Sequence, residues 1–317
     1  MIEPRRDAYG AEADTSNLAD YLELLGLAGT PLRRAEFADY LADQQWVVRS
    51  RELFHDPTVD QGEPSEDEQE GGAGVSPSDD AADHVFELLA ARSDQLGDRY
   101  PFELRDSQLV AKTPIEDRHC AYLCLLAITV AHHYDVATDA TPEDVFEEVV
   151  ADVMGSRGLT TIGTGQAAKG GGDFRKLVER VGDELGLVAD PHAASSRTSA
   201  RDEGVDAVSY LSWGDKRAGH WVFVGQATCA RSNEWKGKIA EPAPTQWASL
   251  LNCVVHPLAY LAVPHHVEDK HLLHLSEKSG RLVLDRLRLT RHLDSLSRSQ
   301  GTLLAAVTAE GVYHPLR

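Results

Sequence analysis

Apolar residues recur at helical spacing along the first part of the chain. Residues 15–27, TSNLADYLELLGL, and 30–46, TPLRRAEFADYLADQQW, each open with a threonine that can cap a helix. Residues 119–134, HCAYLCLLAITVAHHY, are apolar on nearly all sides, which predicts a buried helix. The same spacing predicts amphipathic helices at 81–97, 141–155 and 171–187.

Strand patterns follow later, apart from a short strand or hairpin predicted at 100–112, YPFELRDSQLVAK. Residues 207–211 and 220–228 are apolar runs joined by a glycine-bounded turn, GDKRAG, which predicts a β-hairpin. A short helix is predicted next, at 244–251. Further strand and helix material is predicted at 257–267 and 279–293. This order of elements is typical of an α/β core with a helical preface.

The composition of residues 57–80 divides the chain. The segment is poor in apolar residues, and ten acidic residues but no basic one lie between Asp56 and Asp83. Such a segment cannot bury enough surface to fold, so we predict a disordered linker. It would separate a small helical module at 1–56, either a docking appendage or a winged-helix-like unit, from an α/β domain at 81–317.

The net charge of −20 is unevenly distributed. Residues 1–150 contain 11 basic and 33 acidic side chains, whereas residues 151–317 contain 20 basic and 18 acidic ones. The acidity therefore belongs to the front half, and it does not exclude a nucleic-acid site in the second half.

The sequence predicts a cytoplasmic protein without a membrane span. It has no run of 18 apolar residues, and its first residues lack the apolar core of a secretion signal. Four cysteines occur without paired C-x-x-C spacing, which predicts free buried thiols in a reducing compartment. A zinc site at His119, Cys120 and Cys124 is an alternative that lacks a second pair of ligands.

The glycine-rich run from Gly163 to Gly172 is a weak candidate for a phosphate loop. Such a loop needs serine or threonine after its lysine, but Lys169 is followed by Gly170. We therefore predict a flexible connection before the helix at Asp173.

A cysteine hydrolase that uses Cys229 and His220 is a more serious alternative, because the two residues flank one predicted strand. The histidine pairs 132–133 and 265–266 lie in apolar surroundings, and we interpret them as packed or surface residues. No G-x-S-x-G sequence marks a serine nucleophile.

The predicted hairpin brings oxygen ligands to one sheet edge. Asp206 precedes its first strand and Gln226 lies at the end of its second strand, where the backbone carbonyl of Ala227 follows. Carboxylate, amide and carbonyl oxygens suit Mg²⁺. Lys238, and with less support Lys236, can return to this edge from the next helix, where a lysine can orient an attacking water.

This arrangement resembles the PD-(D/E)xK, or restriction-endonuclease-like, nuclease superfamily. LVERVGDELG matches its leading helix, GVDAV its aspartate strand and VFVGQAT its second strand. More narrowly, EGVDAV, GQATCA and WKGK resemble a pattern in uncharacterised bacterial proteins associated with anti-phage defence. YPFEL, VFEEVV and LDRLRL support this likeness, which covers about residues 82–293.

The resemblance implies a restriction-endonuclease-like core, that is, a mixed sheet flanked by helices, with a helical N-terminal extension. It implies an endonuclease that hydrolyses DNA phosphodiester bonds in bacterial antiviral defence, using Mg²⁺ or Mn²⁺ held by Asp206 and Gln226. Lys238 would position water, and Glu179 or Glu184 would recruit metal. Residues expected to hold DNA phosphates are Arg231, Lys236, Arg286 and Arg288.

Two positions depart from the superfamily pattern. Gln226 replaces the usual glutamate, and Thr228 stands where a lysine is expected two residues later. A second expectation therefore stays open, a catalytically inactive nuclease-like subunit that binds DNA or protein partners of a defence system. The sequence leaves the oligomeric state undetermined.

Overall fold

The computed structural model describes residues 14–44, 76–134, 136–163, 174–190, 205–215, 217 and 219–309. Its centre is a mixed five-stranded sheet in the order β3-β4-β5-β6-β7. The strands are β3 (Thr160–Gly163), β4 (Ala207–Leu211), β5 (Trp221–Ala227), β6 (Leu258–Ala262) and β7 (Leu282–Leu284). β4 is antiparallel to both β3 and β5, whereas β6 runs parallel to β5 and β7 parallel to β6.

Helices precede, connect and follow these strands. The first group comprises α1 (Asp14–Leu27), α2 (Arg34–Asp43), α3 (Pro77–Leu96), the short 3₁₀ helix η3 (Gly97–Arg99), α4 (Asp117–Tyr134) and α5 (Pro142–Ser156). The second comprises α7 (Phe174–Leu185), α8 (Ser232–Lys238), α9 (Pro244–Leu250), α10 (Asp269–Ser279), α11 (Arg286–Thr290) and α12 (Arg298–Ala309). A separate hairpin consists of β1 (Phe102–Arg105) and β2 (Gln108–Ala111).

Local sequence signals explain several of these boundaries. The Thr141 hydroxyl accepts a hydrogen bond from the Asp144 backbone N–H, which caps α5, and Pro142 occupies the first turn. Asp106 and Ser107 connect β1 to β2 with φ angles of 48° and 61°. Two successive residues of positive φ match the twist of a tight hairpin, as the pattern at 100–112 predicted.

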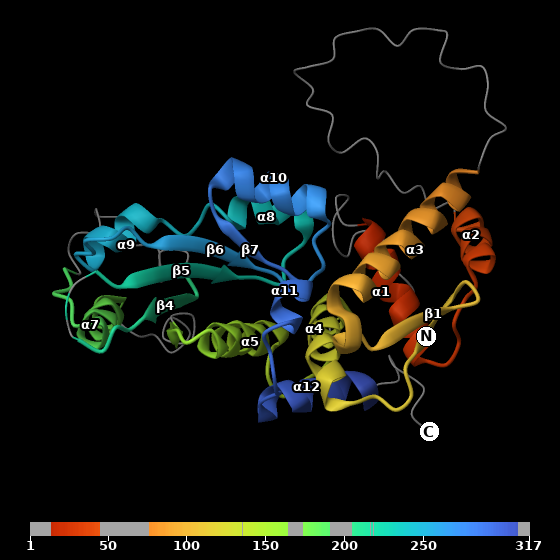
Figure 1. The fold of residues 1–317 in the computed structure, drawn as a ribbon, viewed down its shortest axis with the longest axis horizontal. Coiled ribbons are helices and arrows are strands. Elements are labelled where there is room, and N and C mark those ends of the chain that lie inside the picture. The colour runs from red at the N-terminus through yellow and green to blue at the C-terminus, as the bar shows by residue number, and fades with distance from the viewer. Residues whose placement is uncertain are drawn as a thin grey trace, which may run out of the picture.

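The two faces of the main sheet pack against different helices. Val208 and Val224 lie opposite each other in the register and pack with apolar residues of α7 and α9. α8 and α10 cover the part of this face near Leu261. Tyr260 and Ala262 point to the opposite face and belong to a core shared with α4 and α5. Figure 1 shows α8 and α10 on one side of the sheet and α5 on the other.

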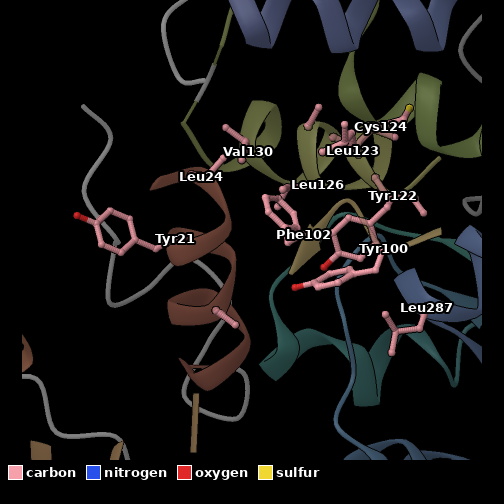
Figure 2. Close-up of a cluster of buried hydrophobic side chains, with 14 of the residues drawn as sticks. Tyr21, Leu24, Tyr100, Phe102, Tyr122, Leu123, Cys124, Leu126, Val130 and Leu287 are labelled. Atoms are coloured by element: carbon pink, nitrogen blue, oxygen red, sulfur yellow. The ribbon is translucent and has the colours of Figure 1, made fainter. Parts of the chain in front are cut away.

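The largest core joins the sheet to the helical half of the molecule. Aromatic rings lie at its centre, where Tyr100 meets both Phe102 and Tyr122 edge to face, with centroid separations of 5.3 and 5.2 Å. Figure 2 shows these three rings close to Leu126 of α4. Burial of such rings contributes several kcal/mol in a core of this kind, roughly 1.5–3 kcal/mol for each large side chain.

The N-terminal helices belong to this same core. Leu18 and Leu22 of α1 and Phe37 of α2 are at most 2% exposed and pack into the cluster that also contains α4 residues. The predicted separate module at 1–56 is therefore corrected: its described helices complete the core of the main body. They do so because their apolar faces, too small to fold alone, bury against α3 and β2.

One further expectation changes, and three elements were not predicted. α3 begins at Pro77, so residues 77–80, which we assigned to the linker, form the first turn of a helix that has two acidic residues near its N-terminus. The rest of the predicted linker, residues 57–75, lies outside the described residues, as does most of the glycine-rich run. The sequence patterns did not predict β3, α10 and α12.

Within the described residues, no helix has the length and apolar character needed to cross a membrane.

Candidate functional site

Asp206 lies directly before β4 and is tied to β5 by two hydrogen bonds. Its backbone N–H donates to the Gly225 carbonyl, and its carboxylate Oδ2 accepts from the Ala227 N–H, each at 2.8 Å. The β4–β5 register ends at the pair of Ala207 and Gly225, so Asp206 and Gln226 each lie next to this last pair, at the same end of the hairpin. The structure thus brings together the two residues that the sequence assigned to a metal site.

The side chain of Gln226 ends in a buried acceptor. The residue is 8% exposed, and its Oε1 has no hydrogen-bond partner among the described residues. A buried amide oxygen without a partner costs about 1–3 kcal/mol, unless a ligand or water satisfies it. This atom is therefore the strongest local sign that something binds beside Asp206.

The ring of Tyr260 on β6 lies against Gly225, next to this end of the hairpin. A Cβ atom at Gly225 would lie 1.9 Å from the Tyr260 ring, so only glycine lets the ring lie against β5. Burial raises the pKa of the Tyr260 hydroxyl, and the charge of Asp206 raises it further. The sequence reasoning missed this residue, although an isolated glycine in a strand is a known sign of close approach.

Lys238 does not contact Asp206 in this structure. Its Nζ lies 2.9 Å from Oε1 of Glu241, which follows α8 by three residues. Trp235 anchors this helix by its burial against the sheet, and Lys238 is partly buried while Lys236 is exposed. The two lysines therefore differ in direction, as expected for neighbours two positions apart on a helix.

Thr228 has a local structural role at the position where the superfamily has lysine. Its N–H donates to the Ala262 carbonyl at 3.0 Å, and its Oγ1 accepts from the Ala230 N–H at 3.1 Å. The side chain therefore stabilises the turn after β5, and it brings no positive charge to the site.

The two glutamates proposed as additional metal ligands lie on the exposed side of α7. Glu179 and Glu184 are both exposed, whereas Val178 and Val181 of the same helix are fully buried. Over the described parts of the chain, no group of three or more histidine, cysteine, aspartate or glutamate side chains is arranged to hold a metal ion. Among the described residues, Asp206 therefore does not belong to such a group.

The residues expected to hold phosphates have different surroundings. Arg231, Lys236 and Arg288 are exposed, so they can meet a ligand. Arg286 is fully buried, and its guanidinium forms a bidentate pair with Asp20 of α1. We therefore correct the role of Arg286, because a residue inside the core and paired with a carboxylate cannot reach DNA.

The cysteine-hydrolase alternative is not supported by the geometry. His220 and Cys229 flank the seven-residue strand β5, which separates them by about 23 Å at ~3.3 Å per residue. Burial raises the pKa of the Cys229 thiol well above its usual value, and the charges of Glu143 and Glu147 act in the same direction. A catalytic thiol needs the opposite shift.

The remaining cysteines and histidine pairs have packing roles. All four cysteines are free, and burial raises the pKa of Cys124 to about 12. His265 and His266 are buried with pKa values lowered well below the usual range, mainly by burial. His133 stacks on His265 at a centroid separation of 5.3 Å. The histidine pairs are thus packed, as predicted.

Comparison of the chain with known protein families, with curated proteins and with solved structures finds no match. What the site can do must therefore be argued from its own residues.

Proposed function

We propose that the chain is a metal-dependent endonuclease of the PD-(D/E)xK type that hydrolyses phosphodiester bonds of DNA, acting in bacterial antiviral defence. The observation that carries the proposal is the position of Asp206 directly before β4, where its carboxylate accepts from the N–H of Ala227, the residue that follows Gln226 on β5. The resemblance in sequence implies that the aspartate strand and the second strand lie side by side, as β4 and β5 do.

The arrangement of the sheet supports the same proposal. An antiparallel β3-β4-β5 meander continues into the parallel strands β6 and β7, with helices on both faces. A mixed sheet of this kind is what the resemblance implied around an aspartate on one hairpin strand and an acidic or amide residue on the next.

The oxygen atoms at this end of the hairpin are of the kind that hard divalent cations bind. Asp206 offers a carboxylate, Gln226 offers a buried amide oxygen without a partner, and the Ala227 carbonyl is adjacent. When bound, Mg²⁺ or Mn²⁺ supplies charge neutralisation at the scissile phosphate and a more acidic water. Asp206 would hold the ion, with its carboxylate already oriented by the Ala227 N–H.

Lys238 is the residue we propose to orient the attacking water. Its present partner, Glu241, is partly exposed, and a pair of this kind contributes only about 0–1 kcal/mol. Exchange of this partner for a substrate phosphate is therefore inexpensive. Exposed Arg231, Lys236 and Arg288 would contact the DNA backbone.

The direct test is cleavage of plasmid and linear DNA by the purified chain with Mg²⁺, with Mn²⁺ and with EDTA. Asp206→Asn should abolish cleavage and leave the melting temperature nearly unchanged. Asp215→Asn is the matched control, because Asp215 lies on the turn at the other end of the same hairpin and is 43% exposed. Equal cleavage by Asp206→Asn and wild type would refute the proposal.

A catalytically inactive DNA- or partner-binding subunit is the second candidate. It is favoured by the lack of a group of three metal-binding side chains among the described residues and by the hydrogen bonds that make Thr228 a turn residue. This alternative predicts DNA or protein binding that is unaffected by Asp206→Asn and no cleavage with either metal ion.

A further inference from the structure

Three arginines and a histidine from distant parts of the sequence gather on one surface. Arg99 ends η3, Arg157 follows α5, and Arg291 and His292 follow α11. The guanidinium of Arg157 contacts the ring nitrogens of His292, and Arg99 donates to the carbonyls of Thr290 and Leu293 at 3.4 Å each. We call Arg99, Arg157, Arg291 and His292 the arginine cluster.

Neutral acceptors hold most of these cations in place. Arg291 donates to the Gln95 carbonyl, and Arg157 contacts an imidazole. Within the described residues, the one carboxylate recorded with the cluster is Asp294, whose Oδ1 lies 3.0 Å from Arg99 Nη2. Three guanidinium charges therefore face one carboxylate, on a chain whose net charge is −20.

Burial and the charges of the three arginines lower the pKa of His292. The pKa of His292 is lowered, first by burial and then by the charges of Arg157, Arg291 and Arg99. The ring lies against the guanidinium of Arg157. The proximity of all three arginines to one ring shows that their charges are concentrated in one place.

The positive charges of neighbouring guanidinium groups repel one another, and a bound anion would offset this repulsion. Two guanidinium groups at close range repel each other, and carbonyl acceptors orient them without cancelling their charge. Arg157 and Arg291 are exposed, so an anion can reach them. Each guanidinium still has N–H donors to offer, in the planar geometry that matches phosphate oxygens.

We propose that the arginine cluster is a phosphate-binding site that holds the sugar–phosphate backbone of a nucleic acid. The inference that the phosphate belongs to a nucleic acid rests on the proposed nuclease function. α11 begins directly after β7, at the end of the sheet that carries Gln226 and Ala227, and the cluster follows that helix. Backbone phosphates at the cluster would position the substrate and carry no sequence information.

The test measures binding of a short fluorescent DNA duplex in EDTA, where no metal-dependent cleavage occurs. We expect the double variant Arg157→Gln/Arg291→Gln to lose at least about tenfold in affinity, and its plot of log K against log salt to flatten by about 2. Arg105→Gln is the matched control: Arg105 is an exposed arginine of the β1–β2 hairpin whose partner is Glu103. It should bind DNA as wild type does.

A further variant separates charge from folding. Arg157→Lys/Arg291→Lys keeps both charges, so it should retain most of the affinity and the full salt slope, even if the exchange lowers the melting temperature. Wild-type affinity and slope in the glutamine variant would overturn the proposal.

The source of the phosphate is tested by competition. Inorganic phosphate at high concentration should displace DNA weakly, and vesicles containing phosphatidylglycerol should not bind the cluster. Vesicle binding that depends on Arg157 and Arg291, without DNA binding, would overturn the assignment to nucleic acid. Because these measurements need no cleavage, loss of the nuclease proposal through an inactive wild type would leave the result for the cluster unaffected.

Discussion

Arg286 of α11 and Asp20 of α1, which lie 266 residues apart in the chain, form a bidentate ion pair in the interior with two N···O distances of 2.7 Å. Arg92 of α3 joins them, with Nη1 2.7 Å from Asp20 and 2.8 Å from Glu23. The hydroxyls of Tyr100 and Tyr122 donate to Glu23. Two arginines and two carboxylates thus balance inside one core.

Removal of one partner from this network should be severe. Asp20→Ala leaves two buried guanidinium groups facing one carboxylate, and we expect a loss of about 3–5 kcal/mol in the free energy of unfolding. The control is Asp83→Asn, which removes the exposed pair with Arg34 and should cost less than about 1 kcal/mol. Urea unfolding measures both, and equal losses would contradict the proposed role of the buried network.

The glycine beneath the candidate site should resist enlargement. Gly225→Ala places a methyl group within the Tyr260 ring, and we expect a loss of at least about 1–3 kcal/mol from overpacking. Gly301→Ala in α12 meets no atom within 4 Å and should stabilise the helix by about 0.5–1 kcal/mol. Opposite signs in thermal unfolding would confirm the close approach at Gly225, whereas a neutral Gly225→Ala would refute it.

At the metal ligands, Asp206→Ala should reduce cleavage by about ten-thousand-fold, because metal loss removes several kcal/mol of transition-state stabilisation.

Gln226→Glu should be tolerated and should tighten Mn²⁺ binding, because it adds a second carboxylate beside Asp206. Isothermal titration with Mn²⁺ measures the latter. A Gln226→Glu variant that folds but binds Mn²⁺ no better would argue against a metal at this edge.

The two lysines of α8 should behave differently. Lys238→Ala should lower the rate of cleavage with little change in DNA affinity, because we place Lys238 at the attacking water. Lys236→Ala should weaken binding to all sequences alike. Single-turnover cleavage and anisotropy separate these effects. Identical behaviour of the two variants would remove Lys238 from the catalytic site.

Stability should decline as the solution is acidified through the histidine range. The pKa values of His265 and His266 are depressed in the folded state, so below the unfolded-state value of about 6.5 the unfolded chain binds protons that the folded chain does not. The free energy of unfolding therefore falls between pH 6.5 and 5, by up to about 1.4 kcal/mol per pH unit for each histidine.

Substitution of His266 should reduce that slope, whatever its effect at pH 8. His84 is the opposite control, because its pKa is raised, chiefly by a hydrogen bond to Glu268. The stability that protonated His84 contributes is fully present below pH 6.5 and is lost only as the pH rises through its raised folded-state pKa. His84→Gln should therefore lower the free energy of unfolding below pH 6.5 and leave the slope between pH 6.5 and 5 unchanged. Chemical denaturation at several pH values measures the slopes, and an unchanged slope in His266→Gln would contradict the assignment.

The sequence by itself determined the features that depend on neighbours in the chain. The cap at Thr141, the turn at Asp106 and Ser107, and the apolar length of α4 follow from residues a few positions apart. The presence of Asp206 and Gln226 at the same end of one hairpin was predictable for the same reason, because the two apolar runs are consecutive in the chain and pair antiparallel.

Only the tertiary structure decided which distant segments share a core. The sequence around Arg286 suggests an exposed cation on a helix. Its burial depends on the ion pair with Asp20, which is 266 residues away and cannot be inferred from local sequence. The arginine cluster was likewise invisible, since Arg99, Arg157 and Arg291 stand in three separate segments. Periodicity records which face of an element is apolar, whereas the pairing of charges over long distances depends on how the packed elements meet.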